Sequence, residues 1–156
     1  MPILWAGLAA LAVAVLGALM TELGDWYYGL RQPPWKPPDQ LFGPAWTLIF
    51  ALAALSGAHA WSRLPERRHR EWLLVLFALN GFLNVLWSLL FFRLQRPDWA
   101  LAEVGFLWLS IALLLAFLTR HDRTAAWLLV PYLAWVTFAA TLNLAVVRLN
   151  GPFGTG

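Results

Sequence analysis

The sequence predicts an all-α integral membrane protein, a bundle of five transmembrane helices with a long proline-rich loop between the first two. Two observations carry this prediction. Apolar residues make up 61% of the 156 residues and charged residues only 12%, against about 45–50% and about 25% in soluble domains. The apolar residues also fall in five stretches, each close to the roughly 20 residues that a helix needs to cross a bilayer. We therefore treat residues 1–156 as a single membrane domain.

The five predicted spans follow one another with short hydrophilic breaks, and they cover residues 3–21, 44–62, 72–92, 99–119 and 124–147. The first stretch has no basic segment before it and no small-x-small cleavage site, so we expect a span rather than a signal peptide. The breaks after the second, third and fourth spans are short, which predicts that consecutive helices are antiparallel neighbours.

Composition argues against several classes of function. The net charge of +3 comes from basic and acidic residues in short clusters between apolar runs, so we expect no binding to nucleic acid. The chain has no cysteine, and its three histidines lack the spacing of metal ligands, so we expect no metal site and no required cofactor. It also has no phosphate-binding glycine loop, no Ser-His-Asp arrangement and no paired carboxylates. We expect a binding protein rather than an enzyme.

The segment between the first two spans is stiff by composition. Residues 32–46 read QPPWKPPDQLFGPAW and hold five of the ten prolines. Because proline fixes its own φ and restricts the residue before it, this segment is predicted to be extended and rigid. Pro44 fits the first turn of the second helix. This segment ends the long loop, residues 22–43, and we interpret it as a preformed cover whose last residues, up to Trp46, are also a pocket wall.

Polar side chains recur on one face of the third span. Asn80, Asn84 and Trp87 are three or four residues apart, which places them on the same side of a helix. A buried Asn in a membrane either bonds a neighbouring helix or lines a cavity. Both readings stay open for Asn80, whereas for Asn84 we favour the lining of a cavity.

The fifth span carries a second such face, with Tyr132, Trp135, Ala139 and Asn143 spaced by three or four residues. A bulky aromatic next to an alanine leaves a notch that either a flat ligand or a neighbouring helix fills. Pro131 removes one backbone hydrogen bond and is expected to bend this helix.

Three further features of the sequence need an interpretation, and for the last two it stays open. His59 is rotated by about 140° from Trp46 on the same helix, so it is a poor ligand for anything that Trp46 holds. Glu103 is predicted about one turn into the fourth span, where it either complements the helix dipole at the interface or serves in proton movement or ligand contact. A stripe of small residues on the first span packs either within the monomer or between two monomers, and comprises Ala6, Ala10, Ala14 and Ala18.

Several motifs together resemble one family. They are WY at 26–27, PPWKPP at 33–38, FGPAW at 42–46, LNGFLNVLW at 79–87, PYLAW at 131–135, AATLN at 139–143 and RLN at 148–150. In order and spacing they resemble the TspO/MBR family, the translocator proteins also called peripheral-type benzodiazepine receptors. The resemblance covers nearly the whole chain. The loop motif and the motif of the fifth span are specific together and weak singly.

The resemblance implies a function beyond what composition gives. It implies five transmembrane helices, a homodimer, and a pocket under the first loop that binds protoporphyrin IX, haem, and isoquinoline or benzodiazepine drugs. It suggests a role in tetrapyrrole sensing, regulation or scavenging. The positions that match the family's pocket are Tyr27, Trp46, Asn84, Trp135 and Ala139, and further candidates are Trp35, Asn80, Trp87 and Leu142.

The resemblance also leaves two alternatives to pure binding. The first is a light- and oxygen-dependent enzyme that degrades porphyrin, in which Trp46 and Trp135 would be the catalytic residues. The second is a transporter of porphyrin or sterol, which the lack of an internal repeat disfavours. Residues 142–148 read LNLAVVR, without the tyrosine of the cholesterol motif in animal relatives, so we doubt high-affinity cholesterol binding. With the compact loops, this suggests a bacterial membrane.

Overall fold

The computed structural model describes residues 2–20 and 24–153, and this part of the chain contains helices and no strand. The elements are α1 (Pro2–Met20), α2 (Asp25–Tyr28), the 3-10 turn η1 (Asp39–Leu41), α3 (Phe42–Arg63), α4 (Arg67–Ser88), the π-helical turn η2 (Leu89–Arg93), α5 (Pro97–His121) and α6 (Arg123–Asn150). The predicted first span ends at residue 21 and the predicted loop begins at residue 22, so these ends lie outside the described residues.

Four stretches of the described chain are long and apolar enough to cross a membrane: Asp39–Arg63, Arg67–Arg93, Pro97–His121 and Arg123–Asn150. A shorter apolar helix, Leu4–Leu19, comes before them. Large apolar side chains such as Leu113 and Phe106 are more than half exposed on the outside of the bundle, as expected of a surface that faces lipid.

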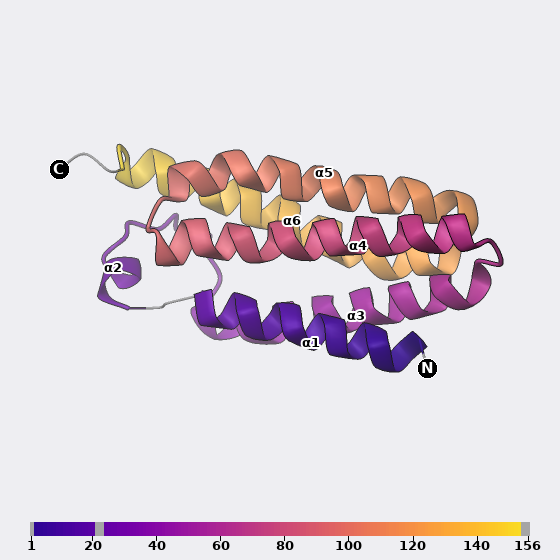
Figure 1. The fold of residues 1–156 in the computed structure, drawn as a ribbon. Helices are drawn as coiled ribbons and strands as arrows, with labels where there is room; N and C mark the ends of the chain where they lie inside the picture. The colour runs from indigo at the N-terminus through magenta and orange to yellow at the C-terminus, as the bar shows by residue number, and fades with distance from the viewer. Residues whose placement is uncertain (1, 21–23, 154–156) are drawn as a thin grey trace.

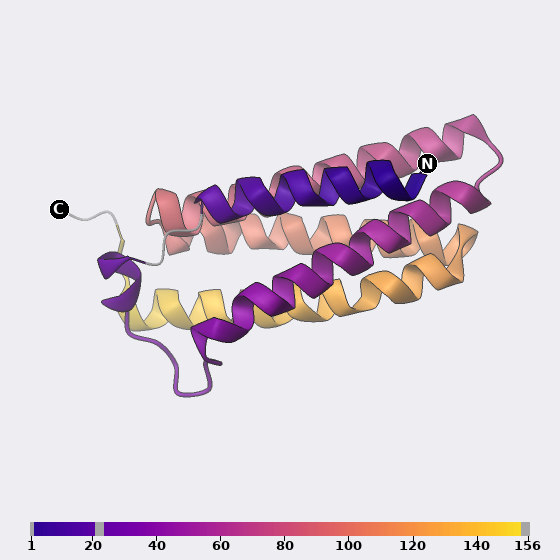
Figure 2. The same ribbon diagram turned by 90° about the horizontal axis from the view of Figure 1, so that it is seen from below.

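The long helices run side by side along the length of the bundle (Figure 1), and α3 runs obliquely to the others (Figure 2). α5 packs against both α4 and α6, and α1 packs against α3 and α4. A view from below shows α3 running beside α6, which completes a closed arrangement (Figure 2). α2 and the C-terminus lie at one end of the bundle, and the N-terminus lies at the other. The segment between α1 and α3 therefore sits over a single end of the bundle.

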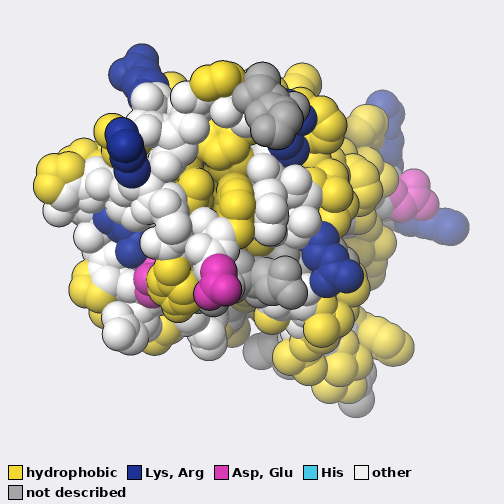
Figure 3. All heavy atoms as spheres, turned by 90° about the vertical axis from the view of Figure 1, so that its left-hand side faces the viewer, with side chains coloured by type: hydrophobic (Ala, Val, Ile, Leu, Met, Phe, Trp, Pro, Cys, Tyr) yellow, Lys and Arg dark blue, Asp and Glu magenta, His cyan; other side chains and the backbone are white. Residues whose placement is uncertain are grey.

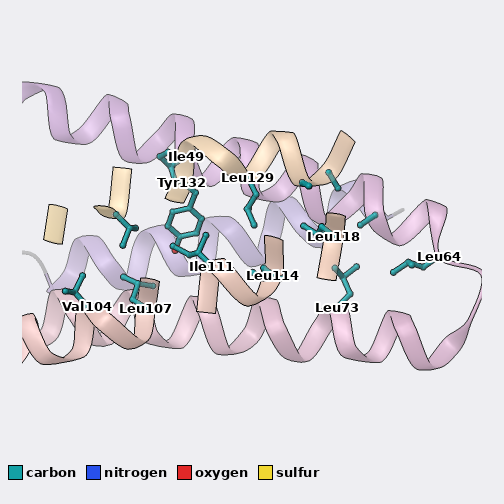
Figure 4. Close-up of a cluster of buried hydrophobic side chains, with 14 residues drawn as sticks. Ile49, Leu64, Leu73, Val104, Leu107, Ile111, Leu114, Leu118, Leu129 and Tyr132 are labelled. Atoms are coloured by element: carbon teal, nitrogen blue, oxygen red, sulfur yellow. The ribbon is translucent and has the colours of Figure 1, made fainter. Parts of the chain in front are cut away.

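The hydrophobic core runs along the inner face of α5. Ile111, Leu114 and Leu118 are fully buried there, spaced by three or four residues as an inward helix face requires. Figure 4 shows Tyr132 of α6 inserted among these side chains, with its ring beside Ile111. Because Tyr132 is only 2% exposed, α6 brings a polar hydroxyl into the middle of an apolar core.

Polar contacts tie α3 to the start of α6 at the end of the bundle far from α2. His59 Nδ1 lies 2.5 Å from Asp122 Oδ2, and Ser56 Oγ donates to the carbonyl of Ala125 at 2.8 Å. Asp122 also caps α6, because its Oδ1 accepts a bond from the Ala125 N–H at 3.3 Å. His59 therefore helps to hold α3 against the start of α6. This agrees with its predicted rotation away from Trp46.

α1 packs against α3 and α4 within the chain. Of its small residues, Ala6, Ala10 and Ala14 are half-buried and Ala18 is exposed. Gly81 of α4 comes so close to α1 that a Cβ there would lie 3.1 Å from Val13 Cγ2. The close approach of these two helices therefore depends on a small residue of α4.

Candidate functional site

A cavity of about 520 Å³ opens between the helices beneath the segment that joins α1 to α3. Its walls come from α1, α2, α3, α4, η2 and α6. Figure 3 shows this end of the bundle, where charged side chains are scattered among apolar ones. The lining residues are Ala14, Val15, Gly17, Ala18, Tyr27, Gln32, Asp39, Phe42, Gly43, Trp46, Thr47, Phe50, Asn84, Trp87, Ser88, Phe91, Phe92, Trp135, Phe138, Ala139, Leu142, Asn143 and Val146.

Two tryptophans from different helices form one wall. Trp46 of α3 and Trp135 of α6 meet edge to face, with ring centroids 6.2 Å apart and planes at 86°. Trp46 also stacks on Phe50 at 5.5 Å, and Phe42 contacts Trp135 at 6.0 Å. Aromatic pairs at these distances add to the burial of apolar area. The wall is therefore a rigid apolar surface on which a flat molecule can lie.

The π-helical turn η2 forms another part of the cavity wall. Leu94 N–H bonds the carbonyl of Leu89 at 2.8 Å, which is the wider spacing of a π turn. The turn places both Phe91 and Phe92 at the cavity. Their ring centroids are 4.7 Å apart, and Phe91 also stacks on Trp87 at 5.2 Å.

The back of the cavity is polar, and its hydrogen bonds join three helices. Asn84 Nδ2 donates to the Tyr132 hydroxyl at 2.8 Å, and Trp87 Nε1 donates to Asn143 Oδ1 at 3.1 Å. Asn143 Nδ2 in turn donates to the carbonyl of Pro97 at 2.9 Å. These polar groups therefore hold α4, α5 and α6 together and also face the cavity.

Residues 24–41, the cover of the cavity, are held in place by ionic and hydrogen-bonded contacts. The Tyr27 hydroxyl donates to Asp39 Oδ1 at 2.6 Å, and Lys36 Nζ lies 2.7 Å from the same oxygen. Burial, followed by the hydrogen bond to Asp39, raises the pKa of Tyr27 well above its usual value. Two parts of this cover, α2 and η1, are thus joined by a hydrogen bond from a neutral phenol to a carboxylate.

A second fastening joins this cover to the end of α6. Asn150 Oδ1 accepts a bond from the Arg31 N–H at 2.7 Å, and Asn150 Nδ2 donates to the Arg31 carbonyl at 2.8 Å. The amide therefore pairs with both backbone groups of one loop residue.

Two buried polar atoms at the cavity have no partner among the described residues. They are the donor Trp135 Nε1 and the acceptor Gln32 Oε1. Buried polar groups are nearly always satisfied in proteins. Both atoms are also shielded from solvent, so a molecule in the cavity would meet other polar groups of its lining, such as Thr47 and Asn84. No group of three potential metal-ligating side chains occurs in the described chain.

The structure brings seven of the nine predicted ligand-binding residues to this cavity: Tyr27, Trp46, Asn84, Trp87, Trp135, Ala139 and Leu142. The other two lie elsewhere. Trp35 is half exposed and packs edge to face on Phe138 at 5.9 Å. Asn80 is buried behind the cavity, where its Nδ2 donates to Ser110 Oγ at 3.1 Å, so it acts as a link between α4 and α5.

Some lining residues are absent from the predicted set. Phe50 stacks on Trp46, and its four-residue spacing from Trp46 is a signal in the sequence that both share one helix face. Phe91 and Phe92 carried no such signal, because a π turn departs from the ordinary helical period.

The expectation that Glu103 reaches the membrane interface is wrong. α5 begins at Pro97, two residues before the predicted span, so Glu103 lies in the second turn. Its side chain points inward with the core face and is only 6% exposed.

Comparisons with known proteins agree over almost the whole chain. The profile of the TspO/MBR family matches residues 6–149. The chain is 38% identical over 142 residues to "Tryptophan-rich protein TspO" of Chlorobaculum tepidum, covering 90% of each. It is 35% identical over 139 residues to "Tryptophan-rich sensory protein" of Cereibacter sphaeroides, covering 89% of this chain and 85% of that one.

A human protein is similar as well. The chain is 32% identical over 126 residues to the human "Translocator protein", covering 80% of this chain and 75% of that one. With its four long apolar helices, the chain is a multi-pass integral membrane protein. It belongs to the TspO/MBR family.

Proposed function

We propose that this protein binds flat, conjugated tetrapyrroles such as protoporphyrin IX and haem in the cavity, and that it acts in their sensing, regulation or scavenging. The observation that carries the proposal is a cavity of about 520 Å³ whose lining includes nine aromatic side chains. Small-molecule sites commonly have volumes of about 300–1,000 Å³ and apolar walls with a few polar groups. The name of the sensory relative supports a role in sensing.

The chemistry of the walls suits a large planar ring. Trp46, Trp135, Phe91 and Phe92 present π surfaces to the cavity from α3, α6 and η2. No histidine lines the cavity among the described residues, so the walls would hold haem by its ring and its side groups.

The proposal also covers the role of α1 in the membrane and the role of residues 24–41. α1 acts as a fifth membrane span, and residues 24–41 act as a rigid cover whose fastenings at Asp39 and Asn150 keep it over the cavity. Stiffness in a cover lowers the ordering cost of binding. Isoquinoline and benzodiazepine drugs are smaller planar ligands for the same walls, and the homodimer stays a prediction.

The test is a titration of the purified protein in detergent with protoporphyrin IX, followed by the absorbance of the porphyrin. The Trp46→Phe/Trp135→Phe variant is expected to bind at least several-fold more weakly, because both indoles face the cavity. The matched control is Trp5→Phe/Trp127→Phe, since these two indoles are 69% and 73% exposed on the outside. Equal affinity in the cavity variant and the control would count against this site.

A second candidate is the photo-oxidative degradation of the bound porphyrin, with molecular oxygen as the oxidant. The observation that favours it is the contact of Trp46 and Trp135, which places two oxidisable rings side by side at the ligand. Illumination of the complex in air is expected to give one defined product, and illumination without oxygen none. The same product from Trp46→Phe/Trp135→Phe, or unspecific bleaching alone, would exclude a role for these indoles.

A further inference from the structure

The end of the bundle away from α2 carries an excess of positive charge. Residues 63–71 and 120–123 form the two turns there, between α3 and α4 and between α5 and α6, and they hold six of the eleven basic residues but three of the eight acidic ones. The cavity and its cover lie at the opposite end (Figure 1), so the ligand site does not account for this charge. The six basic residues are all arginines: Arg63, Arg67, Arg68, Arg70, Arg120 and Arg123.

The two turns lie side by side. The ring centroids of His69 on α4 and His121 on α5 are 4.4 Å apart. Asp122, between α5 and α6, is engaged with His59 of α3. The arginines of both turns therefore share one polar end of the bundle, where α3 and α5 end and α4 and α6 begin.

The acidic residues of this end already have partners. Glu71 Oε1 lies 3.1 Å from Arg67 Nε, and Glu66 Oε2 lies 3.6 Å from His69 Nδ1. The third acid, Asp122, is the one engaged with α3. The positive charge is therefore not balanced from within the described chain. Five arginines have no acidic partner there: Arg63, Arg68, Arg70, Arg120 and Arg123.

Helix stability does not explain these arginines. A positive side chain in the first turn of a helix opposes the helix dipole. α4 nevertheless begins with RRHR at 67–70 and has no acidic residue in its first turn. The arginines of α4 thus act against the local preference of their own helix, as expected of residues that serve a partner outside it.

Two of these arginines each precede an exposed tryptophan by four residues. Arg68 and Trp72 lie one turn apart on α4, and Arg123 and Trp127 lie one turn apart on α6. Residues at this spacing share a helix face and are separated by about 6 Å along the axis. The two tryptophans are 50% and 73% exposed. Because such tryptophans sit at the boundary between headgroups and acyl chains, a guanidinium one turn farther out reaches the level of the lipid phosphates.

We propose that anionic phospholipids bind at this end of the bundle, with the phosphate of one lipid on Arg68, that of another on Arg123, and the glycerol region of each against the tryptophan one turn deeper. A guanidinium binds a phosphate through two parallel hydrogen bonds, which a lysine does not offer, and both turns have arginines and no lysine. Clusters of basic residues next to a membrane span attract anionic lipids. The unbalanced charge selects a lipid of net negative charge over a zwitterionic one, and the exposed indoles select a lipid over a free phosphate.

Lipid retention tests the proposal. The protein in detergent is incubated with equal amounts of phosphatidylglycerol and phosphatidylcholine of identical acyl chains, and the bound lipids are counted by native mass spectrometry. The wild type is expected to retain phosphatidylglycerol at least several-fold better, and Arg68→Gln/Arg123→Gln is expected to lose most of this preference. The matched control is Arg93→Gln/Arg148→Gln, which removes the same charge at the opposite end, from two exposed side chains without a tryptophan one turn deeper. Equal losses in both variants would show attraction by net charge alone and would overturn the proposal.

Two further measurements identify the ligand as a lipid. Trp72→Ala/Trp127→Ala keeps all the arginines and is expected to weaken the retention of phosphatidylglycerol at least several-fold. An excess of glycerol 1-phosphate is expected to leave the bound lipid in place. Displacement by this soluble phosphate, or full retention without the two indoles, would contradict a lipid site. Helix content and unfolding temperature establish that the variants are folded.

Discussion

Trp87 Nε1 donates a hydrogen bond of 3.1 Å to Asn143 Oδ1 across the back of the cavity, from α4 to α6. The same amide donates to the Pro97 carbonyl at 2.9 Å and so reaches α5. Asn143 is 1% exposed, so both bonds lie away from solvent. One side chain therefore joins three helices of the bundle.

Asn143→Ala is expected to destabilise the protein more than most single changes within a membrane helix. Each lost bond is worth about 0.6 kcal/mol within a membrane, and the unpartnered Trp87 N–H adds a desolvation penalty of about 1–3 kcal/mol. Reversible unfolding in mixed detergent measures the loss. Thr141→Val is the control, because Thr141 is exposed and bonds only its own helix. Equal losses in both variants would contradict the bridging role of Asn143.

The bond from Tyr27 to Asp39 predicts a stability term that depends on pH. Burial and then Asp39 raise the pKa of Tyr27 above its ordinary value of about 10. The protonated phenol therefore contributes its full stability below about pH 10, and the contribution is lost as the pH rises through the folded-state pKa. The measurement is the tyrosinate absorbance of the wild type minus that of Tyr27→Phe during an alkaline titration. This difference is expected to appear at a higher pH than the ionisation of a free tyrosine, about pH 10.

The control for this titration is Tyr28→Phe, which removes an exposed phenol from the same short helix. Coincident transitions for the two tyrosines would contradict the protected bond. Tyr27→Phe is also expected to speed the dissociation of a bound ligand, since it removes one fastening of the cover.

Asn150→Ala is expected to loosen the cover without affecting the rest of the bundle. The amide pairs with both backbone groups of Arg31, at 2.7 and 2.8 Å. Without it, the Arg31 N–H loses its acceptor, and amide hydrogen exchange in residues 30–36 is expected to be at least tenfold faster. The neighbouring change Leu149→Ala, at an exposed side chain, serves as the control. Unchanged exchange in Asn150→Ala would show that other contacts hold the cover.

Two glycines offer a matched pair of substitutions. A Cβ at Gly81 would lie 3.1 Å from Val13 Cγ2, whereas a Cβ at Gly105 of α5 would meet nothing within 4 Å. Gly81→Val is therefore expected to push α1 away and to cost about 1–3 kcal/mol from overpacking, while Gly105→Val is expected to be near neutral. Unfolding measurements on both variants check this, and equal costs would mean that helix propensity alone decides.

Periodicity was sufficient to predict much of the cavity. The spacing of Asn84 and Trp87 on one helix, and of Trp135 and Ala139 on another, follows from 3.6 residues per turn, and all four side chains line the cavity. Trp35 lies in a turn closed by a bond of 3.1 Å from the Lys36 N–H to the Pro33 carbonyl, so the predicted extended conformation is wrong at this point. Proline predicts stiffness here, but it does not predict the direction of the Trp35 ring, which packs edge to face on Phe138.

The surroundings of Asn80 and Glu103 depend on how helices pack together, which the local sequence does not determine. Asn80 sits on the predicted face of Asn84, but its partner Ser110 comes from a helix whose position the sequence does not encode locally. Glu103 is inward because it shares the buried face of α5 with Leu107 and Ile111, which follow it at intervals of four residues. The sequence gives this shared face, but which face turns inward depends on how the neighbouring helices pack.

The π turn at Leu89–Arg93 has a consequence for how such a protein can diverge. A π turn holds one residue more than an ordinary helical turn. Because the turn takes up this residue locally, deleting one of the two phenylalanines there would restore the usual winding and leave the neighbouring helices in nearly the same rotation. The cavity would lose one aromatic ring and gain space. A change of one residue in chain length at this turn is therefore a route to a different ligand preference without a rearrangement of the bundle.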